Sequence, residues 1–178
     1  MKIALDANAL VAWASGDGEA CARIRSLVAH KGSVVVIPMQ AFSEFLVKAD
    51  DAGSAWISLV EKQRSFTLAP FDRRAAIQCS ELDRIALARK TNVATAPQKK
   101  KTAPTVDTKQ KIKVDRQIVA IAMVASVDLL VTNDRGMLRI AHDCGLNAKS
   151  IDELDLPASS RQHELRFNEA QAAPQAPT

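Results

Sequence analysis

The sequence predicts an α/β fold with a mainly parallel central sheet. Short aliphatic runs alternate along the chain with longer stretches in which apolar residues recur at helical spacing. Residues 34–37 are Val-Val-Val-Ile between Gly32 and Pro38, a continuous run typical of a strand buried on both faces of a parallel sheet. A length of 178 residues suits one compact domain with appendages.

The first half of the chain contains three expected strands, each followed by helical segments. The strands are expected at residues 2–5, 33–37 and 66–68, and the helices at residues 8–13, 17–30, 39–50, 54–64 and 72–90. Gly32 ends the second helix, Pro70 closes the third strand, and Asp72 is suited to cap the long helix that follows.

The second half begins with a change in composition. Residues 92–113 hold six Lys, four Thr and two Pro and almost no large apolar residue, which predicts a mobile basic loop inserted in the domain. Asp115 is then expected to open a helix, followed by a strand, a turn, a short helix and a last strand at residues 129–131, 133–136, 137–143 and 148–151. Residues 157–178, rich in Ala, Gln and Pro, are expected to form a disordered tail, which leaves residues 1–156 as the domain.

Composition excludes several classes of protein. Only seven residues are aromatic, which argues against a base-stacking surface. The longest apolar run has eight residues, far below the roughly 20 that a membrane span needs, and no convincing signal peptide is present. Three scattered Cys and three scattered His fit neither a disulfide framework nor a zinc site, so a reducing cytoplasm is expected.

Three aspartates stand where α/β proteins place their sites. Asp6 and Asp134 follow expected strands, and the carboxyl ends of parallel strands meet at one edge of the sheet. Asp115 lies three residues before Ile118, so it continues the apolar face of its helix and points inward. A buried carboxylate needs a partner, and a divalent metal shared with other acids would supply one.

Ordinary structural roles remain open for each of these acids. Asp6, Asp115 and Asp134 all precede or open helices, where Asp is a preferred N-cap. Glu44 lies at the edge of the apolar face of its helix, and periodicity alone predicts that it is solvated.

Four segments together resemble the PIN-domain family of VapC-like ribonucleases. In chain order and across residues 2–152, they are Leu5-Asp6-Ala7-Asn8, Ser43-Glu44-Phe45-Leu46, Asp115-Arg116-Gln117-Ile118-Val119-Ala120-Ile121-Ala122 and Leu130-Val131-Thr132-Asn133-Asp134-Arg135-Gly136-Met137. The resemblance implies a three-layer α/β/α sandwich. It also implies that the metal-binding, catalytic acids are Asp6, Glu44, Asp115 and Asp134, with Asn8 and Thr132 as polar neighbours.

The function implied by this resemblance is Mg²⁺- or Mn²⁺-dependent hydrolysis of RNA. Both ions prefer oxygen ligands and can activate a water beside a phosphodiester. The family also suggests a homodimer and, if the chain is a toxin, an antitoxin partner; an RNA-processing role is another option. The alternative is a non-catalytic PIN-fold module that binds RNA or protein. A dehalogenase-like phosphatase is disfavoured because Asn8 stands where a second Asp is needed, and the chain has no glycine-rich phosphate loop.

The net charge of +4 is concentrated in one segment. Residues 92–113 carry six Lys and one Asp, or +5, so the rest of the chain carries −1. A basic segment beside acidic residues can hold a phosphate backbone that the acids would repel; a solubilising loop or a protein-binding segment is the alternative. The residues expected to contact RNA are Lys99, Lys100, Lys101, Lys109, Lys111, Lys113 and Arg116.

Overall fold

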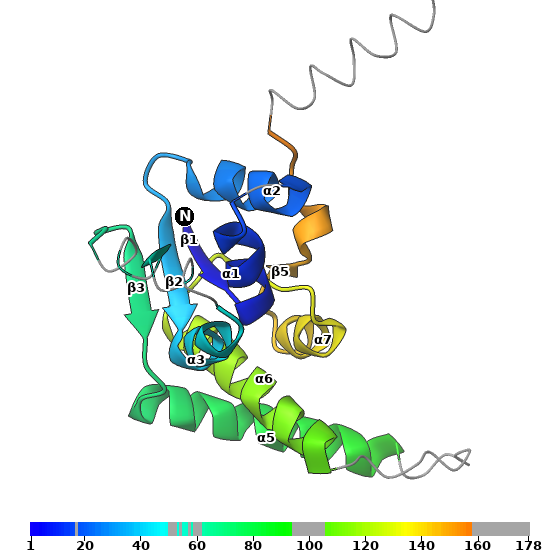
Figure 1. Cartoon of the computed structure of the whole chain (residues 1–178). Coiled ribbons are helices and arrows are strands. Elements are labelled where there is room, and N and C mark those ends of the chain that lie inside the picture. The colour runs from blue at the N-terminus through cyan, green and yellow to red at the C-terminus, as the bar shows by residue number, and fades with distance from the viewer. Residues whose placement is uncertain are drawn as a thin grey trace, which may run out of the picture.

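The central sheet has five strands, all paired in parallel, in the order β3-β2-β1-β4-β5 (Figure 1). The computed structural model describes residues 1–16, 18–49, 62–93 and 106–157, with positions 53, 55, 56 and 58. The strands are β1 (Lys2–Leu5), β2 (Val34–Pro38), β3 (Phe66–Ala69), β4 (Leu129–Val131) and β5 (Ala148–Lys149). This arrangement confirms the predicted α/β class, and the sheet is parallel throughout the described strands.

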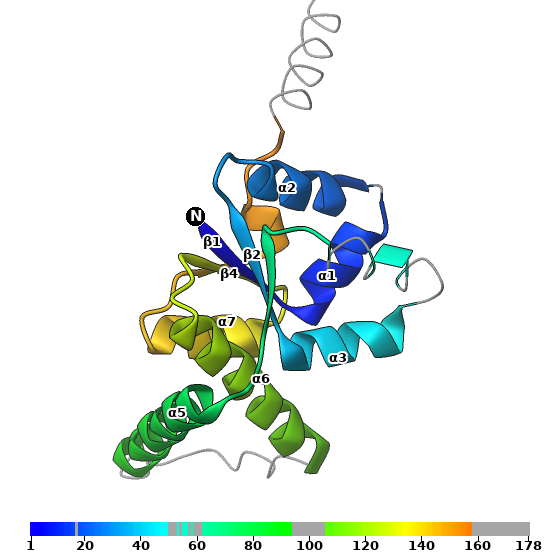
Figure 2. The same ribbon diagram turned by 90° about the vertical axis from the view of Figure 1, so that its left-hand side faces the viewer.

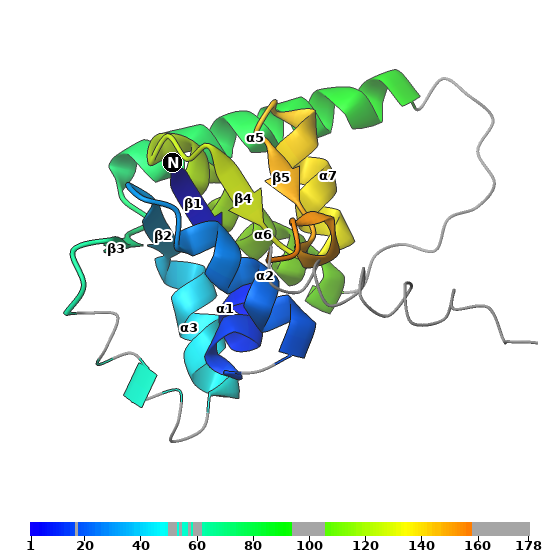
Figure 3. The same cartoon turned by 90° about the horizontal axis from the view of Figure 1, so that it is seen from above.

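Helices cover both faces of the sheet, which confirms the expected three-layer sandwich (Figure 3). They are α1 (Ala7–Ala14), α2 (Gly18–Val28), α3 (Met39–Lys48), α5 (Arg73–Val93), α6 (Val106–Val124), α7 (Arg135–Asp143) and the short 3₁₀ helix η1 (Ile151–Glu153).

Alternate residues of each strand belong to different cores. Ile3 and Leu5 pack with residues of α1, α2 and α3, whereas Ala4 between them packs with residues of α5, α6 and α7. This alternation follows from the two-residue period of a strand. Because both faces are covered, the strands contain almost only apolar residues, as the sequence indicated.

The order of the strands changes direction beside β1. The chain runs outward from β1 to β2 and β3, then returns to place β4 and β5 on the other side of β1. In open α/β sheets, ligands bind outside the carboxyl ends of the strands at such a point. Here the register pairs Leu5 with Val131, so the residues that follow, Asp6 and Thr132, are neighbours.

The prediction of a loop over residues 92–113 is wrong at both of its ends. Helix α5 continues to Val93, and α6 already begins at Val106, so Asp115 lies inside α6 instead of opening it. The segment 106–113 is rich in residues with good helix propensity, such as Lys and Gln, and it continues directly into the part of α6 that is buried in the core, from Val114 onward. Figure 2 shows these two helices on the same side of the sheet.

Smaller differences concern the C-terminal third. Helix α7 begins at Arg135, within the expected turn. The last strand ends at Lys149, and η1 begins at Ile151, which was expected to belong to that strand. The expected tail after residue 157, most of the expected helix at 54–64, and residues 94–105 lie outside the described residues. In the described part of the chain, no helix is long and apolar enough to cross a membrane.

Candidate functional site

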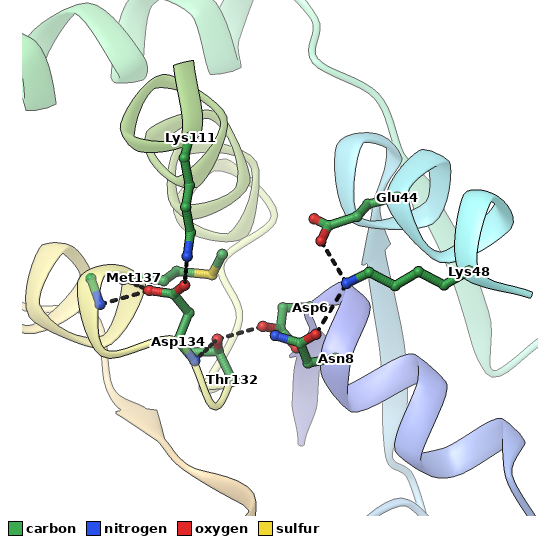
Figure 4. A network of polar contacts seen from close by, with 9 residues as sticks. Asp6, Asn8, Glu44, Lys48, Lys111, Thr132, Asp134 and Met137 are labelled. Atoms are coloured by element: carbon green, nitrogen blue, oxygen red, sulfur yellow. Dashed lines mark hydrogen bonds and ion pairs between the residues drawn. The ribbon is translucent and has the colours of Figure 1, made fainter. Parts of the chain in front are cut away.

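The acidic side chains gather at the carboxyl ends of β1 and β4. Figure 4 shows Asp6 between two groups of contacts, one formed around Asp134 and one formed around Glu44. The Asp6 carboxylate is 3% exposed. Its Oδ1 accepts a hydrogen bond of 2.7 Å from the Ala9 backbone N–H, and its Oδ2 accepts one from the Thr132 hydroxyl.

The pKa of Asp6 lies above its usual range. Burial is the main cause, and the charges of Glu44 and Asp134 act in the same direction, while the hydrogen bonds from Thr132 and Ala9 oppose the shift. Thr132 is completely buried, and its Oγ1 also accepts a hydrogen bond of 3.0 Å from the Asp134 backbone N–H. Thr132 thus links the two strand ends through one hydroxyl.

Asp134 uses its two oxygens differently. Oδ1 accepts hydrogen bonds from the backbone N–H groups of Gly136 (2.6 Å) and Met137 (3.1 Å), which caps α7. Oδ2 forms an ion pair of 2.6 Å with Nζ of Lys111 from α6. Partial burial raises the pKa of Asp134, but the Lys111 contact and the two backbone donors outweigh it, so the pKa lies below its usual range.

Capping and site formation are therefore compatible. Asp6 and Asp134 each cap a helix with Oδ1 and present Oδ2 toward the site. The sequence left these roles as alternatives, and the structure shows that one carboxylate has an oxygen for each.

Asp115 is buried, as its place on the apolar face of α6 predicts, with 6% of its surface exposed. Burial and then the charge of Asp134 raise its pKa to about 6, although the charge of Lys111 opposes the shift. No hydrogen bond to its carboxylate occurs among the described residues. An inward-facing carboxylate without a donor is costly, which makes Asp115 the acid most in need of a cation.

Gly136 lies beside two of these carboxylates. A Cβ built at this position would be 3.0 Å from Oδ1 of Asp134 and 3.7 Å from Oδ2 of Asp115. Glycine is therefore the residue that leaves both carboxylates room.

Glu44 is the least enclosed of the four acids. Its side chain is 47% exposed and forms an ion pair of 2.8 Å with Lys48, one turn later in α3. Nζ of Lys48 also donates to Oδ1 of Asn8 at 3.2 Å, so Asn8 lies beside Lys48. The prediction from periodicity was solvation, and the half-exposed side chain agrees with it, yet its charge still raises the pKa values of Asp6 and Asp115.

The basic residues expected at RNA do not share one location. Lys111 reaches Asp134, but Arg116 forms an ion pair of 2.5 Å with Asp83 of α5. Lys109 and Lys113 are exposed; they stand about 160° from Lys111 around α6, at 100° per residue. Lys99, Lys100 and Lys101 lie outside the described residues.

The donor chemistry of this site fits Mg²⁺ or Mn²⁺. Four carboxylates provide the hard oxygen ligands that these ions prefer, and Gly136 leaves room between two of them. Nevertheless, the described residues contain no group of three acid, histidine or cysteine side chains arranged to hold an ion. Ammonium groups of Lys111 and Lys48 already contact two of the four acids.

Sequence reasoning missed two residues of this site, Lys48 and Gly136. The signal for Lys48 was its position four residues after Glu44, a spacing that pairs opposite charges on a helix. The same spacing relates Lys111 to Asp115 and would have distinguished Lys111 from the other lysines as a residue of the site.

A surface hollow of about 520 Å³ lies away from this site, along α2 near Cys21, Arg25 and Pro157.

Substitution of Gly136 by Ala is expected to affect catalytic activity and thermal stability differently. The added Cβ would displace the Asp134 carboxylate, while Ala is favoured over Gly in a helix by about 1 kcal/mol. If the site is catalytic, we expect Gly136→Ala to lower activity at least tenfold. We expect the melting temperature to change little, because weaker capping of α7 by Asp134 and the higher helix propensity of Ala act in opposite directions and each amounts to about 1 kcal/mol. Arg139→Ala, at an exposed position of the same helix, is the control for both measurements. Full activity of Gly136→Ala would show that the room beside Gly136 is not used.

Comparisons with known proteins identify the class of fold. No family model and no curated protein matches the sequence. Among solved structures, VapBC2 from Rickettsia felis bound to a DNA fragment from their promoter matches with a TM-score of 0.54 and 18% identity, covering 84% of this chain and 98% of that chain. DNA-bound VapBC from Salmonella typhimurium matches with a TM-score of 0.52 and 20% identity, covering 85% of this chain and 98% of that chain.

These likenesses establish the fold and nothing further. The chain has a VapC-like, PIN-type α/β fold over most of its length. This agrees with the resemblance that the four sequence segments carried.

Proposed function

We propose that this protein is a metal-dependent ribonuclease that uses the acids at the ends of β1 and β4. The observation that carries the proposal is the convergence of Asp6, Asp115 and Asp134, two of them buried, at the point where the strand order changes direction. Buried acids with raised pKa values and few donors are uncommon in structural roles and frequent in active sites. The likeness to VapBC structures supports the same choice.

The residues of this chain would divide the work as follows. Asp6, Asp115 and Asp134, with Glu44 at the rim, would hold Mg²⁺ or Mn²⁺, which when bound supplies an activated water and charge stabilisation. Thr132 and the helix caps would keep Asp6 and Asp134 in place. Asn8 and Lys48 lie where a polar substrate group could be contacted.

The proposed substrate is RNA, and the proposed biological role is that of the toxin in a toxin–antitoxin pair. Two solved structures to which this fold is similar are VapBC structures, which favours an antitoxin partner; an RNA-processing role is the alternative. A homodimer and a cytoplasmic location are further expectations from the family. Phosphate contacts from Lys111, and from the expected basic residues outside the described part, would offset the acidic charge.

A non-catalytic module of the same fold is the second candidate. The observation that favours it is the absence, among the described residues, of three acids arranged for one ion. In such a module, Lys111 and Lys48 would neutralise the acids permanently.

The test uses the full-length purified protein and a labelled single-stranded RNA. We expect cleavage with Mn²⁺ or Mg²⁺, loss of cleavage in EDTA, and recovery when excess Mn²⁺ is restored. Asp6→Asn should remove cleavage while circular dichroism stays unchanged, and Asp152→Asn, at an exposed position of η1, should cleave like the wild type. Wild-type protein that turns over no RNA in Mn²⁺ would favour the non-catalytic module.

A further inference from the structure

Lys111 is distinct among the basic residues of α6. Its Nζ lies 2.6 Å from Oδ2 of Asp134, although 64% of its side chain is exposed (Figure 4). Lys111 stands one helical turn before Asp115, so the two residues share a face of α6. Lys109 and Lys113 lie on the other side of the helix, and Arg116 is engaged with Asp83. Among the described basic residues of α6, Lys111 alone is paired with an acid of the site.

The charges around the site are only partly balanced. Asp6, Glu44, Asp115 and Asp134 would together carry −4 when ionised, and the ammonium groups of Lys111 and Lys48 contribute +2. The remaining −2 equals the charge of one divalent cation. Lys48 contacts Glu44 and Lys111 contacts Asp134. The two buried carboxylates, those of Asp6 and Asp115, therefore have no contacting ammonium group among the described residues.

Lys111 and a divalent ion would compete for the same oxygen. Oδ1 of Asp134 is occupied by two backbone N–H groups, so Oδ2 is the oxygen that remains for a ligand bond. An ammonium group 2.6 Å from Oδ2 would lie within a few ångströms of any ion bound there, where like charges repel strongly. The exposed, four-carbon side chain of Lys111 can swing away, whereas the capping bonds hold Asp134 in place.

We propose that Lys111 is a displaceable counter-ion: it neutralises Asp134 in the metal-free protein and leaves Oδ2 when a divalent cation binds. Once released, its ammonium group is free to contact a phosphate beside the ion, a step that rests on the proposed ribonuclease function. The lysine therefore lowers the affinity of the free protein for metal and favours metal binding when a phosphate offers it another partner. This arrangement accounts for a set of donors that suits a divalent ion although, among the described residues, no three of them are gathered around one position.

The first experiment measures Mn²⁺ binding without RNA, from the electron paramagnetic resonance signal of free Mn²⁺. Lys111→Met keeps most of the length of the side chain and removes the charge, and Lys111→Gln keeps a polar end. We expect both variants to bind Mn²⁺ roughly tenfold more tightly than the wild type. Lys109→Met, the same change two residues earlier on the opposite side of the helix, should stay within about twofold of the wild type.

The second experiment follows lysine side-chain NH₃⁺ groups by ¹⁵N nuclear magnetic resonance during a Mg²⁺ titration. The Lys111 signal should shift as its ion pair with Asp134 breaks, and the Lys109 signal should not. Unchanged or weaker Mn²⁺ binding in Lys111→Met overturns the proposal, as does a Lys111 signal that ignores saturating Mg²⁺. Absence of Mn²⁺ binding in wild type and variants alike overturns it too, because no ion then competes.

These outcomes are separate from those of the cleavage test. A protein that cleaves no RNA can still bind Mn²⁺ more tightly without Lys111, which would support the counter-ion role and contradict the ribonuclease function. If the wild type cleaves RNA and Lys111→Met has an unchanged Mn²⁺ affinity, the ribonuclease function is supported and the counter-ion role is contradicted.

Discussion

Asp115→Asn is expected to abolish RNA cleavage and, at the same time, to make the metal-free protein more stable. The catalytic loss should reach at least about a thousandfold, because a metal ligand contributes several kcal/mol to the transition state and each 1.36 kcal/mol is a factor of ten. The gain in stability is expected because Asp115 is a buried carboxylate whose pKa is raised to about 6 by burial and by the charge of Asp134. Asn has nearly the same shape and carries no charge.

The opposite signs of these two effects make the variant informative. A residue that serves only the fold would lose stability and activity together when it is replaced. Cleavage rates at saturating Mn²⁺ and urea unfolding in EDTA measure the two effects, and Asp152→Asn provides the matched change at an exposed position. Near-wild-type cleavage by Asp115→Asn would contradict the ribonuclease proposal at its central residue.

The stability of the metal-free protein should also depend on pH through Asp115. The pKa of its carboxyl group is about 6 in the folded protein, against the ordinary value of 3.8 in the unfolded chain. Below pH 3.8 the carboxyl is protonated in both states; between the two values the folded protein binds more protons, so its stability falls as the pH rises. Above about pH 6 the loss is complete, on the order of 2–3 kcal/mol.

Because other acids titrate in the same pH range, the contribution of Asp115 is measured as the difference in unfolding free energy between a variant and the wild type. Asp134, whose pKa is lowered, contributes stability that is lost as the pH falls, which opposes the effect of Asp115. We therefore expect the unfolding free energy of Asp115→Asn minus that of the wild type to increase between pH 4 and pH 7 in EDTA. Saturating Mn²⁺ should reduce this difference by stabilising the ionised carboxylate. A difference that stays constant with pH would mean that Asp115 titrates normally.

Much of this site could be anticipated because strand ends are visible in the sequence. The apolar runs before Asp6 and Thr132 define where β1 and β4 end, and parallel pairing then brings those ends together. The inward direction of Asp115 followed from its spacing to Ile118, which is independent of where the helix begins.

The features of the site that could not be predicted depend on contacts between segments that are distant in the sequence. The sequence predicted Lys111 in a loop, whereas the start of α6 at Val106 places it on a helix from which it reaches Asp134. The role of Gly136 depends on two carboxylates from different elements approaching the same point. Glu44 stays ambiguous because it is half-exposed, so neither periodicity nor burial decides its role.

The placement of β1 between β2 and β4 brings together acids from the two halves of the chain. Asp6 and Glu44 come before α5, and Asp115 and Asp134 come after it. A truncated product that ends within α5, or one that starts after it, therefore carries only half of the acidic side chains. Two such fragments could restore the set only by re-forming the pairing of Ile3, Ala4 and Leu5 with residues 129–131. Fragment complementation would thus report on whether the two halves can re-form that short ladder together with the contacts of α6 with α3 and β2.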